Sequence, residues 1–249
     1  MRIAPLLALA VIALGACSDA APSTAPDEDL RPSAHAVGNA SAAAIHRYRV
    51  TITNLTSGQP LSPGVLVTHT RRVSLFEIGE LASTGIREIA ENGDPTAAAA
   101  ELQGRHGVSD VVTTVAPVGR MGGGPFASTL MTEIDAARSA NFLSLSLMLI
   151  CTNDGFAGLD AVRLPGGFRE AVFYAQAYDA GTEANDEVAG SIVPPCFGIG
   201  PVGGLVGGSG RTAEHRRIHP HRNIQGVADL TAAHRWDGPV AKIIVQRIR

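Results

Sequence analysis

The strongest constraint on the fold is a set of short segments in which apolar and polar residues alternate. Tyr48, Val50 and Ile52 alternate with polar residues, which is the period of a strand with one buried face. Residues 142–150 alternate Leu with Ser and then become wholly apolar, which indicates a strand that grows more buried along its length. Other short strands are expected at residues 129–135, 171–175, 191–193 and 240–248. These segments predict a mainly β domain.

Helices are expected in few places. Residues 76–92 carry apolar side chains at roughly helical spacing, and the Asn92-Gly93 pair is a good stop signal. Asp94 and Pro95 then suit the N-cap and first position of a second helix, which continues to Gln103. Short helices between strands favour a β-sandwich with elaborated loops.

Composition excludes several classes of protein. The chain has 249 residues, 45% of them hydrophobic, which is too apolar for a wholly disordered protein. Its formal net charge is -3, whereas a nucleic-acid binder usually carries a basic patch. We therefore expect no nucleic-acid partner.

The N-terminus predicts export and lipid anchoring. Met1-Arg2 precedes an apolar run over residues 3–14, which is typical of a secretory signal and too short to span a bilayer. The run ends in Leu14-Gly15-Ala16-Cys17, which resembles the lipobox of bacterial lipoproteins, where the Cys is lipidated and becomes the first mature residue. Ordinary cleavage near Ala16 is the alternative.

Three regions follow from this interpretation: a signal peptide at 1–16, a lipidated Cys17 with an Ala/Pro/Ser-rich flexible tether at 17–44, and a domain at 45–249. The membrane would then be a partner through the lipid anchor. Ser18, rather than Asp, follows Cys17. In enterobacterial-type sorting that favours the outer membrane, on its periplasmic face or at the cell surface.

Two further cysteines, Cys151 and Cys196, remain after Cys17 is assigned to lipid. Beyond the inner membrane the compartment is oxidising, so a disulfide is possible. Two buried free thiols are the alternative.

Two other motifs have ordinary explanations. Residues 198–203 match G-x-G-x-x-G, but Pro194-Pro195 precedes them and more glycines follow, so a loop is expected rather than a nucleotide site.

His215, His219 and His221 lie close together and such imidazoles can bind zinc or copper. Neighbouring arginines would repel a cation, so a solvated basic loop is the competing interpretation.

Acidic residues stand at the ends of several expected strands. Asp154 lies in a turn after the buried strand that ends at Ile150, the segment 178–183 forms a second acidic turn, and Asp135 ends another strand. Carboxylates on loops at one end of a sandwich can converge on Ca²⁺, which takes 6–8 hard oxygen ligands. An Asp-Gly pair can also be no more than a turn.

Three blocks in order resemble the spondin domain family. Residues 152–160, TNDGFAGLD, are similar to the family's SPDWFVGVDSL stretch. Residues 178–182 are identical to its YDAGT block, and residues 85–93, GIREIAENG, are similar to GLRDFAERG. The closing strand at 239–245 also fits, so the resemblance covers residues 48–249.

The resemblance implies a C2-like antiparallel β-sandwich that binds Ca²⁺. The family's metal carboxylates match Asp154, Asp179 and, by ungapped extension, Asp135, although Glu133 lies on the same strand face and is an alternative. Asp160 matches a further family Asp without an assigned role. Asn153 and Phe156 depart from the family's Pro and Trp, and the His/Arg segment has no counterpart.

These observations lead us to expect a lipid-anchored envelope protein with a calcium-binding spondin domain. We expect it to be a non-catalytic adhesion or ligand-binding module, with a glycan or protein of the envelope or extracellular space as ligand. The alternative is a metal-dependent envelope hydrolase that uses the Asp site or the His215–His221 cluster.

Overall fold

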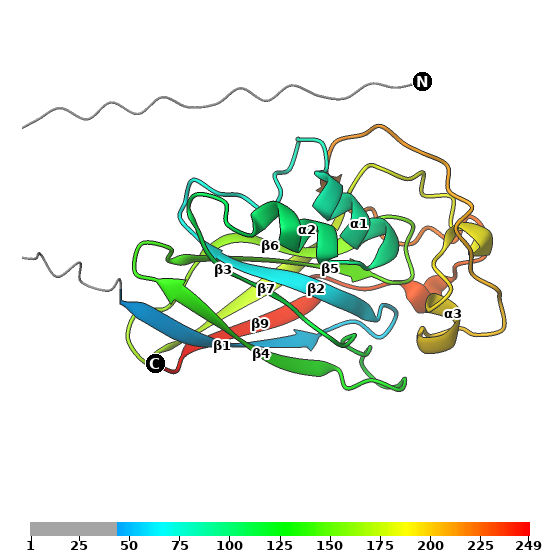
Figure 1. Cartoon of the computed structure of the whole chain (residues 1–249). Coiled ribbons are helices and arrows are strands. Elements are labelled where there is room, and N and C mark those ends of the chain that lie inside the picture. Colours follow the sequence, from blue (N-terminus) through cyan, green and yellow to red (C-terminus); the bar gives the residue numbers. More distant parts are fainter. Residues whose placement is uncertain (1–43) are drawn as a thin grey trace, which may run out of the picture. The chain divides into compact units, whose positions relative to one another are not determined.

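Nine strands pair into one antiparallel sheet in the computed structural model, which describes residues 44–249 (Figure 1). They are β1 (Ile45–Asn54), β2 (Leu61–His69), β3 (Val108–Thr113), β4 (Thr129–Ala137), β5 (Phe142–Leu149), β6 (Gly155–Arg163), β7 (Glu170–Asp179), β8 (His219–Pro220) and β9 (Ala241–Arg247). The pairing order is β3-β2-β5-β6-β7-β9-β1-β4, and β8 pairs with β7. The predicted signal peptide, the lipidation site Cys17 and the tether up to residue 43 lie outside the described residues.

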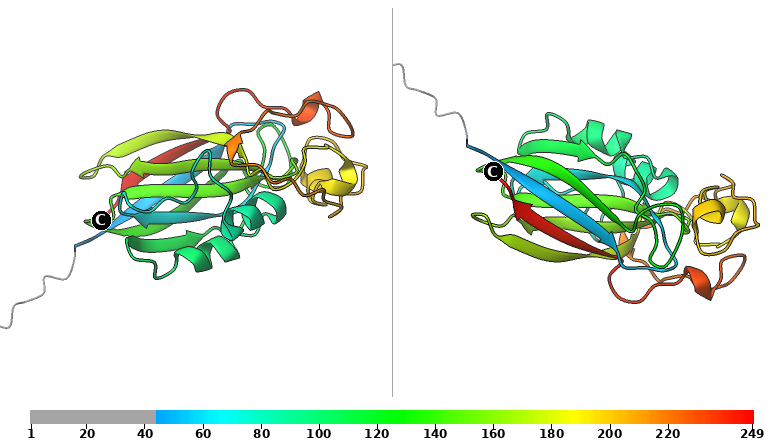
Figure 2. Two further views of the ribbon diagram at one scale, coloured as in Figure 1. Left: turned by 90° about the horizontal axis from the view of Figure 1, so that it is seen from above. Right: turned by 90° about the horizontal axis from the view of Figure 1, so that it is seen from below.

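Strand β7 turns this sheet into two layers. Its first half, residues 170–175, pairs with β9, whereas residues 176–179 pair with β6. One layer therefore holds β4, β1 and β9, and the other holds β3, β2, β5 and β6 (Figure 2). The predicted mainly β antiparallel sandwich is confirmed.

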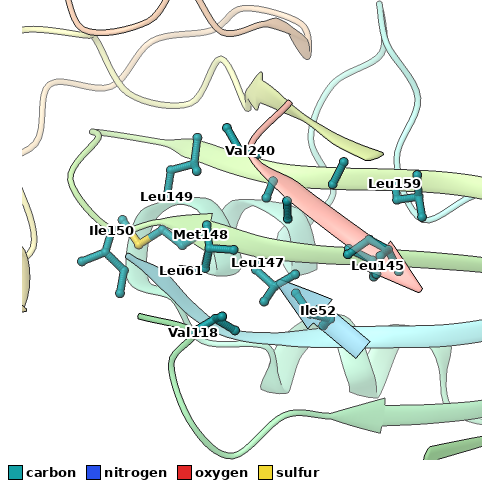
Figure 3. Packing of buried hydrophobic residues seen from close by; sticks show 14 of the residues in the cluster. Ile52, Leu61, Val118, Leu145, Leu147, Met148, Leu149, Ile150, Leu159 and Val240 are labelled. Carbon is teal, nitrogen blue, oxygen red and sulfur yellow. The ribbon is translucent and has the colours of Figure 1, made fainter. Parts of the chain in front are cut away.

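The core lies between the two layers. Val50 and Ile52 of β1 contribute to it, together with Leu145, Leu147 and Leu149 of β5. Figure 3 shows Ile52 and the three leucines of β5 in one cluster with Leu61 of β2 and Leu159 of β6. The Leu/Ser alternation of β5 arises because the serines face away from this core while remaining buried.

Two helices cover the outer face of the layer that contains β2 and β5. Helix α1 (Thr84–Asn92) begins after Ser83, whose hydroxyl accepts the Ile86 amide, and ends at Gly93 with φ 67°. Helix α2 is Thr96–Leu102; its N-cap residue is Pro95 rather than the expected Asp94, whose carboxylate accepts the Thr96 amide at 2.9 Å. Both predicted helices are confirmed, although the first begins eight residues later than expected. A second cluster of buried apolar side chains joins these helices to β2 and β6.

Strand assignments differ from the expectation in two respects. Residues 191–193 do not form the expected strand; a short 3₁₀ helix η1 (Ala189–Ser191) and a loop lie there, because no strand pairs with this segment. No strand is predicted at β2, β3 or β6: β2 and the first five residues of β6 are buried without alternation, and β3 is only partly buried along its length.

The remaining described helices lie beyond the strands. Helix α3 (Cys196–Ile199) and the 3₁₀ helix η2 (Ala232–His234) belong to the long connection from β7 to β9, and Figure 2 shows this connection at one end of the sheets. The G-x-G-x-x-G match begins inside α3, and no helix opens at its last glycine. Among the described residues, no helix has the length and apolar character needed to cross a membrane.

Candidate metal site

Two of the predicted carboxylates meet where β5, β6 and β7 reach the same end of the sandwich. Asp154 lies in the turn between β5 and β6, and Asp179 ends β7. Gly155 pairs with Asp179 across the two strands, and the Asp154 carbonyl accepts the Ala180 amide at 3.0 Å. The pairing of β6 with β7 therefore brings Asp154 next to Asp179. Both side chains are fully buried.

The two oxygens of Asp154 differ in their surroundings. Oδ2 accepts the backbone amides of Thr182 at 2.7 Å and Glu183 at 3.0 Å, and also the Thr182 hydroxyl at 3.2 Å. Oδ1 is buried and has no hydrogen-bond partner. A buried polar atom without a partner is costly, so Oδ1 needs a ligand or a proton.

Asp179 is held by the loop that follows it. Its Oδ1 accepts the Gly181 amide at 2.8 Å, and its Oδ2 accepts the side-chain amide of Asn185 at 2.6 Å. Gly181 has φ 71°, and a Cβ there would lie 2.6 Å from the Arg216 carbonyl oxygen. The YDAGT block therefore needs its glycine for both backbone conformation and close approach.

A third buried carboxylate, Glu183, stands at the end of the same turn. Its side chain is 2% exposed, and its Oε1 lies 2.6 Å from Arg211 Nε. Neither oxygen makes an aligned hydrogen bond, so the contact with Arg211 is an ion pair with poor directionality. Arg211 also contacts Glu91 and Asn92 at the end of α1.

Charge repulsion links these three carboxylates. Burial, and then the charge of Asp179, raise the pKa of Asp154 to about 6. Burial raises the pKa of Glu183 to about 8; Arg211 opposes this, whereas Glu91 and Asp154 add to it. Negative charge at this end of the sandwich is therefore costly unless a cation offsets it.

Comparison with protein families identifies the domain. The sequence matches the spondin N-terminal domain (Spondin_N) over residues 57–188, just over half of the chain. The chain belongs to the spondin N-terminal domain family. The predicted family resemblance is thereby confirmed. A comparison with curated proteins found no match.

The spondin match includes all three buried carboxylates and ends before the histidine segment. Glu183 was the residue that sequence reasoning missed, although it stands in the acidic turn at 178–183. The sequence signal for it is its place in the same acidic turn, four residues after Asp179.

Asp135 does not join Asp154 and Asp179. Arg47 Nε and Nη2 donate to its two oxygens at 2.7 and 2.8 Å, and this pair lowers the pKa of Asp135. Arg47 stands seven residues before Asn54, at the far end of β1, which is roughly 20 Å along a strand. Glu133, on the same outer face of β4, is half exposed and faces Arg49 at 3.4 Å.

Part of the histidine cluster does reach the carboxylates. Strand β8 pairs His219 with Asp179, and the His219 Nε2 lies 3.7 Å from Asp179 Oδ2. The side chain of His221 is buried against Trp236, with Nε2 lacking a hydrogen-bond partner, and burial lowers its pKa to about 4. His215 is exposed. Arg216 and Arg217 pair with Glu214 and Glu80.

The two cysteines form a disulfide next to this end. Cys151, three residues before Asp154, is bonded to Cys196 at the start of α3, with the Cα atoms 5.0 Å apart. Gln59 holds the backbone of Cys151 in place, because its side chain accepts the Cys151 amide and donates to the Cys151 carbonyl. The disulfide joins the turn of the acidic site to the glycine-rich segment.

Proposed function

We propose that this chain is a lipid-anchored envelope protein whose spondin domain binds Ca²⁺ and acts as a non-catalytic adhesion or ligand-binding module. One observation carries the metal assignment: Asp154 and Asp179 are buried side by side, and Asp154 Oδ1 has no partner. The proposal of export and anchoring rests on the apolar run and Cys17 of the sequence.

The donor set fits a hard cation. Carboxylate and backbone carbonyl oxygens are the ligands that Ca²⁺ prefers, and irregular loops tolerate its variable geometry. Asp154 and Asp179 would hold the ion, and Glu183 replaces Asp135 as the third carboxylate. When bound, the ion would neutralise charges that otherwise repel. Glu183 is paired with Arg211 in this structure, so its oxygens would have to turn from Arg211 toward Asp154.

Such an ion would have a structural consequence. Asp154 belongs to the β5–β6 turn, whereas Asp179 and Glu183 belong to the segment after β7. Shared coordination would fix these two segments relative to each other. The surface they present, together with the segment 198–210, is our proposed ligand-binding face for an envelope or extracellular glycan or protein.

The test is a thermal melt of the purified protein in Ca²⁺ and in EDTA, together with elemental analysis. We expect bound calcium and a higher melting temperature with Ca²⁺. An unchanged melt with no calcium by elemental analysis would remove the metal assignment.

Binding to isolated peptidoglycan and envelope fractions, with and without Ca²⁺, then tests the adhesion role. Metabolic labelling with a fatty acid, with Cys17→Ser as the unlabelled control, tests the anchor.

A metal-dependent hydrolase is the second candidate. It is favoured by the position of His219, which adds an imidazole 3.7 Å from Asp179 and so mixes nitrogen and oxygen donors. Hydrolytic metal catalysis requires an open coordination position and an activated water. Zinc-dependent turnover of phosphate or carboxylic esters that is lost in both Asp179→Asn and His219→Gln would favour the enzyme over the adhesion module.

A further inference from the structure

A second cluster of metal-ligand atoms lies at the disulfide. The Sγ atoms of Cys151 and Cys196 and one ring nitrogen of His234 all lie within 4.8 Å of one another. All three side chains are fully buried. Within residues 44–249, no other set of three His, Cys, Asp or Glu side chains gathers its ligand atoms this closely. The cluster shares no residue with the acidic site.

His234 contributes one ring nitrogen to this cluster, and its Nε2 is the nitrogen left without a hydrogen-bond partner. Its Nδ1 accepts the backbone amide of Thr231 at 3.0 Å, as part of the cap of η2. The proton of the neutral ring is therefore on Nε2, which is buried and has no hydrogen-bond partner. A disulfide sulfur is only a weak acceptor. The oxidised form thus leaves a buried polar group unsatisfied beside two sulfurs.

We propose that the reduced form of this protein binds Zn²⁺ through Cys151, Cys196 and His234, and that the disulfide is its metal-free alternative state. Two thiolates and one imidazole are a soft ligand set that suits zinc and leaves one coordination position open. The same three side chains can therefore hold either a sulfur–sulfur bond or a metal ion, but not both at once.

The chemistry of the exchange balances with a dithiol as reductant. The dithiol supplies two electrons and two protons, the bond between Cys151 and Cys196 breaks, and the dithiol becomes a disulfide. Binding of Zn²⁺ then releases the two thiol protons to solvent. The ring proton of His234 moves from Nε2 to Nδ1, where the Thr231 hydroxyl oxygen lies 3.4 Å away as acceptor. The Thr231 amide then loses its bond to Nδ1.

A cavity of about 450 Å³ provides an approach. Its lining includes Ile150 and Pro195, the residues that precede the two cysteines, and Ile199 of α3. Gly200 lies against the sulfur: a Cβ there would lie 2.7 Å from Cys151 Sγ. The glycine-rich segment thus passes over the disulfide with no side chain at the point of contact.

Cobalt substitution provides the test. The purified protein is reduced with a phosphine, then titrated with Co²⁺ and back-titrated with Zn²⁺. The phosphine becomes the phosphine oxide and, unlike a dithiol, does not compete for the metal. In the reduced protein we expect one Co²⁺ per chain with the near-ultraviolet absorption of a thiolate–cobalt bond. The oxidised protein should show no such absorption. Zn²⁺ should displace the bound Co²⁺. Two protons should be released per ion bound.

Variants separate the ligands from bystanders. His234→Asn keeps an acceptor near the Nδ1 position but lacks Nε2, so it should weaken Co²⁺ binding at least about tenfold, whereas the exposed His106→Asn should not. The Cys151→Ser/Cys196→Ser protein retains Cys17 and should show no thiolate–cobalt absorption. The proposal fails if reduced protein gives no such absorption, if either His234→Asn or the double variant binds as the parent does, or if reduction unfolds the protein both with and without Zn²⁺.

Discussion

The carboxylates at the two ends of the sandwich differ in burial and in their charged partners. At the far end of β1, Asp135 is part exposed and each of its oxygens accepts a hydrogen bond from Arg47. At the other end, Asp154 and Asp179 are fully buried next to each other, and Arg211 is paired with Glu183. The pKa of Asp135 is lowered, whereas the pKa of Asp154 is raised to about 6.

This difference indicates which acidic group a bound metal ion would stabilise most. Asp135 already has a fixed positive partner and remains in contact with water, so a metal ion would gain little there. Asp154 has lost water without gaining a positive partner, and Asp179 adds repulsion. Burial without compensation, rather than the number of acidic residues, therefore distinguishes the candidate metal site.

The largest effect should follow from removing charge at the buried end. If Ca²⁺ is present at about 100 times its Kd, binding stabilises the fold by about 2.7 kcal/mol, or about 5–10 °C in melting temperature for a domain of this size. Asp154→Asn or Asp179→Asn should abolish this shift, whereas the matched change Asp135→Asn should preserve it. Calorimetric melts in Ca²⁺ and in EDTA measure all three.

The stability of Asp154→Asn relative to the parent in the absence of metal provides a second test. Asn at 154 can still accept the bonds from Thr182 and Glu183, but it no longer repels Asp179. In EDTA at pH 8, Asp154→Asn should therefore be as stable as the parent or more stable. A clear loss of stability in EDTA would mean that the charge of Asp154 is satisfied within the protein and needs no ion.

Arg211 should behave as an internal competitor of the metal. In Arg211→Gln, the buried Glu183 loses its cation, so the metal-free protein should lose about 1–3 kcal/mol, or about 2–12 °C. Ca²⁺ should then bind more tightly, because Glu183 no longer has to leave the guanidinium. Isothermal titration measures the affinity, and Arg217→Gln, which removes an exposed pair with Glu80, is the control. Equal or weaker Ca²⁺ binding in Arg211→Gln would exclude Glu183 as the third carboxylate.

The pH dependence should reveal the same buried charge. The pKa of Glu183 is raised above its unfolded value, so its contribution to stability is present below that unfolded value and is lost as pH rises through about 8. Between pH 6.5 and 8 the metal-free protein should lose about 1–2 kcal/mol, and Glu183→Gln should flatten this slope. Denaturant melts in EDTA measure it. A slope that survives the substitution would assign the titration to another group.

Below pH 6.5 the buried carboxylates and His221 act in opposite directions. The raised pKa values of Glu183 and Asp154 favour the fold as pH falls toward about 4.5. The lowered pKa of His221, about 4, removes stability as pH falls from 6.5 to 4. We therefore expect the parent to gain stability on acidification, Glu183→Gln to show little net change, and His221→Gln to gain more than the parent, as measured by denaturant melts in EDTA.

Local patterns predicted the fold better than the site. Alternation in β1 and β5 and the stop at Gly93 are local signals, and the structure follows them. Asp154 and Asp179 were predicted through short blocks of sequence, and the pairing of β6 with β7 explains why they meet. The separation of Asp135 from them depends instead on which end of β4 faces which loop, which is a property of register across the whole sheet. The approach of His219 to Asp179 likewise depends on a two-residue strand that has no sequence signal.

The smallest effect is expected at the exposed end. Arg47 and Asp135 are about a third exposed, and surface ion pairs typically contribute 0.2–1 kcal/mol. A double-mutant cycle of Arg47→Ala and Asp135→Ala should give a coupling energy of about 1 kcal/mol or less, which decreases in high salt and does not change with Ca²⁺. Coupling that depended on Ca²⁺ would show that the two ends are linked through the sheet. The contrast between a self-neutralised and an uncompensated carboxylate would then no longer explain where the ion binds.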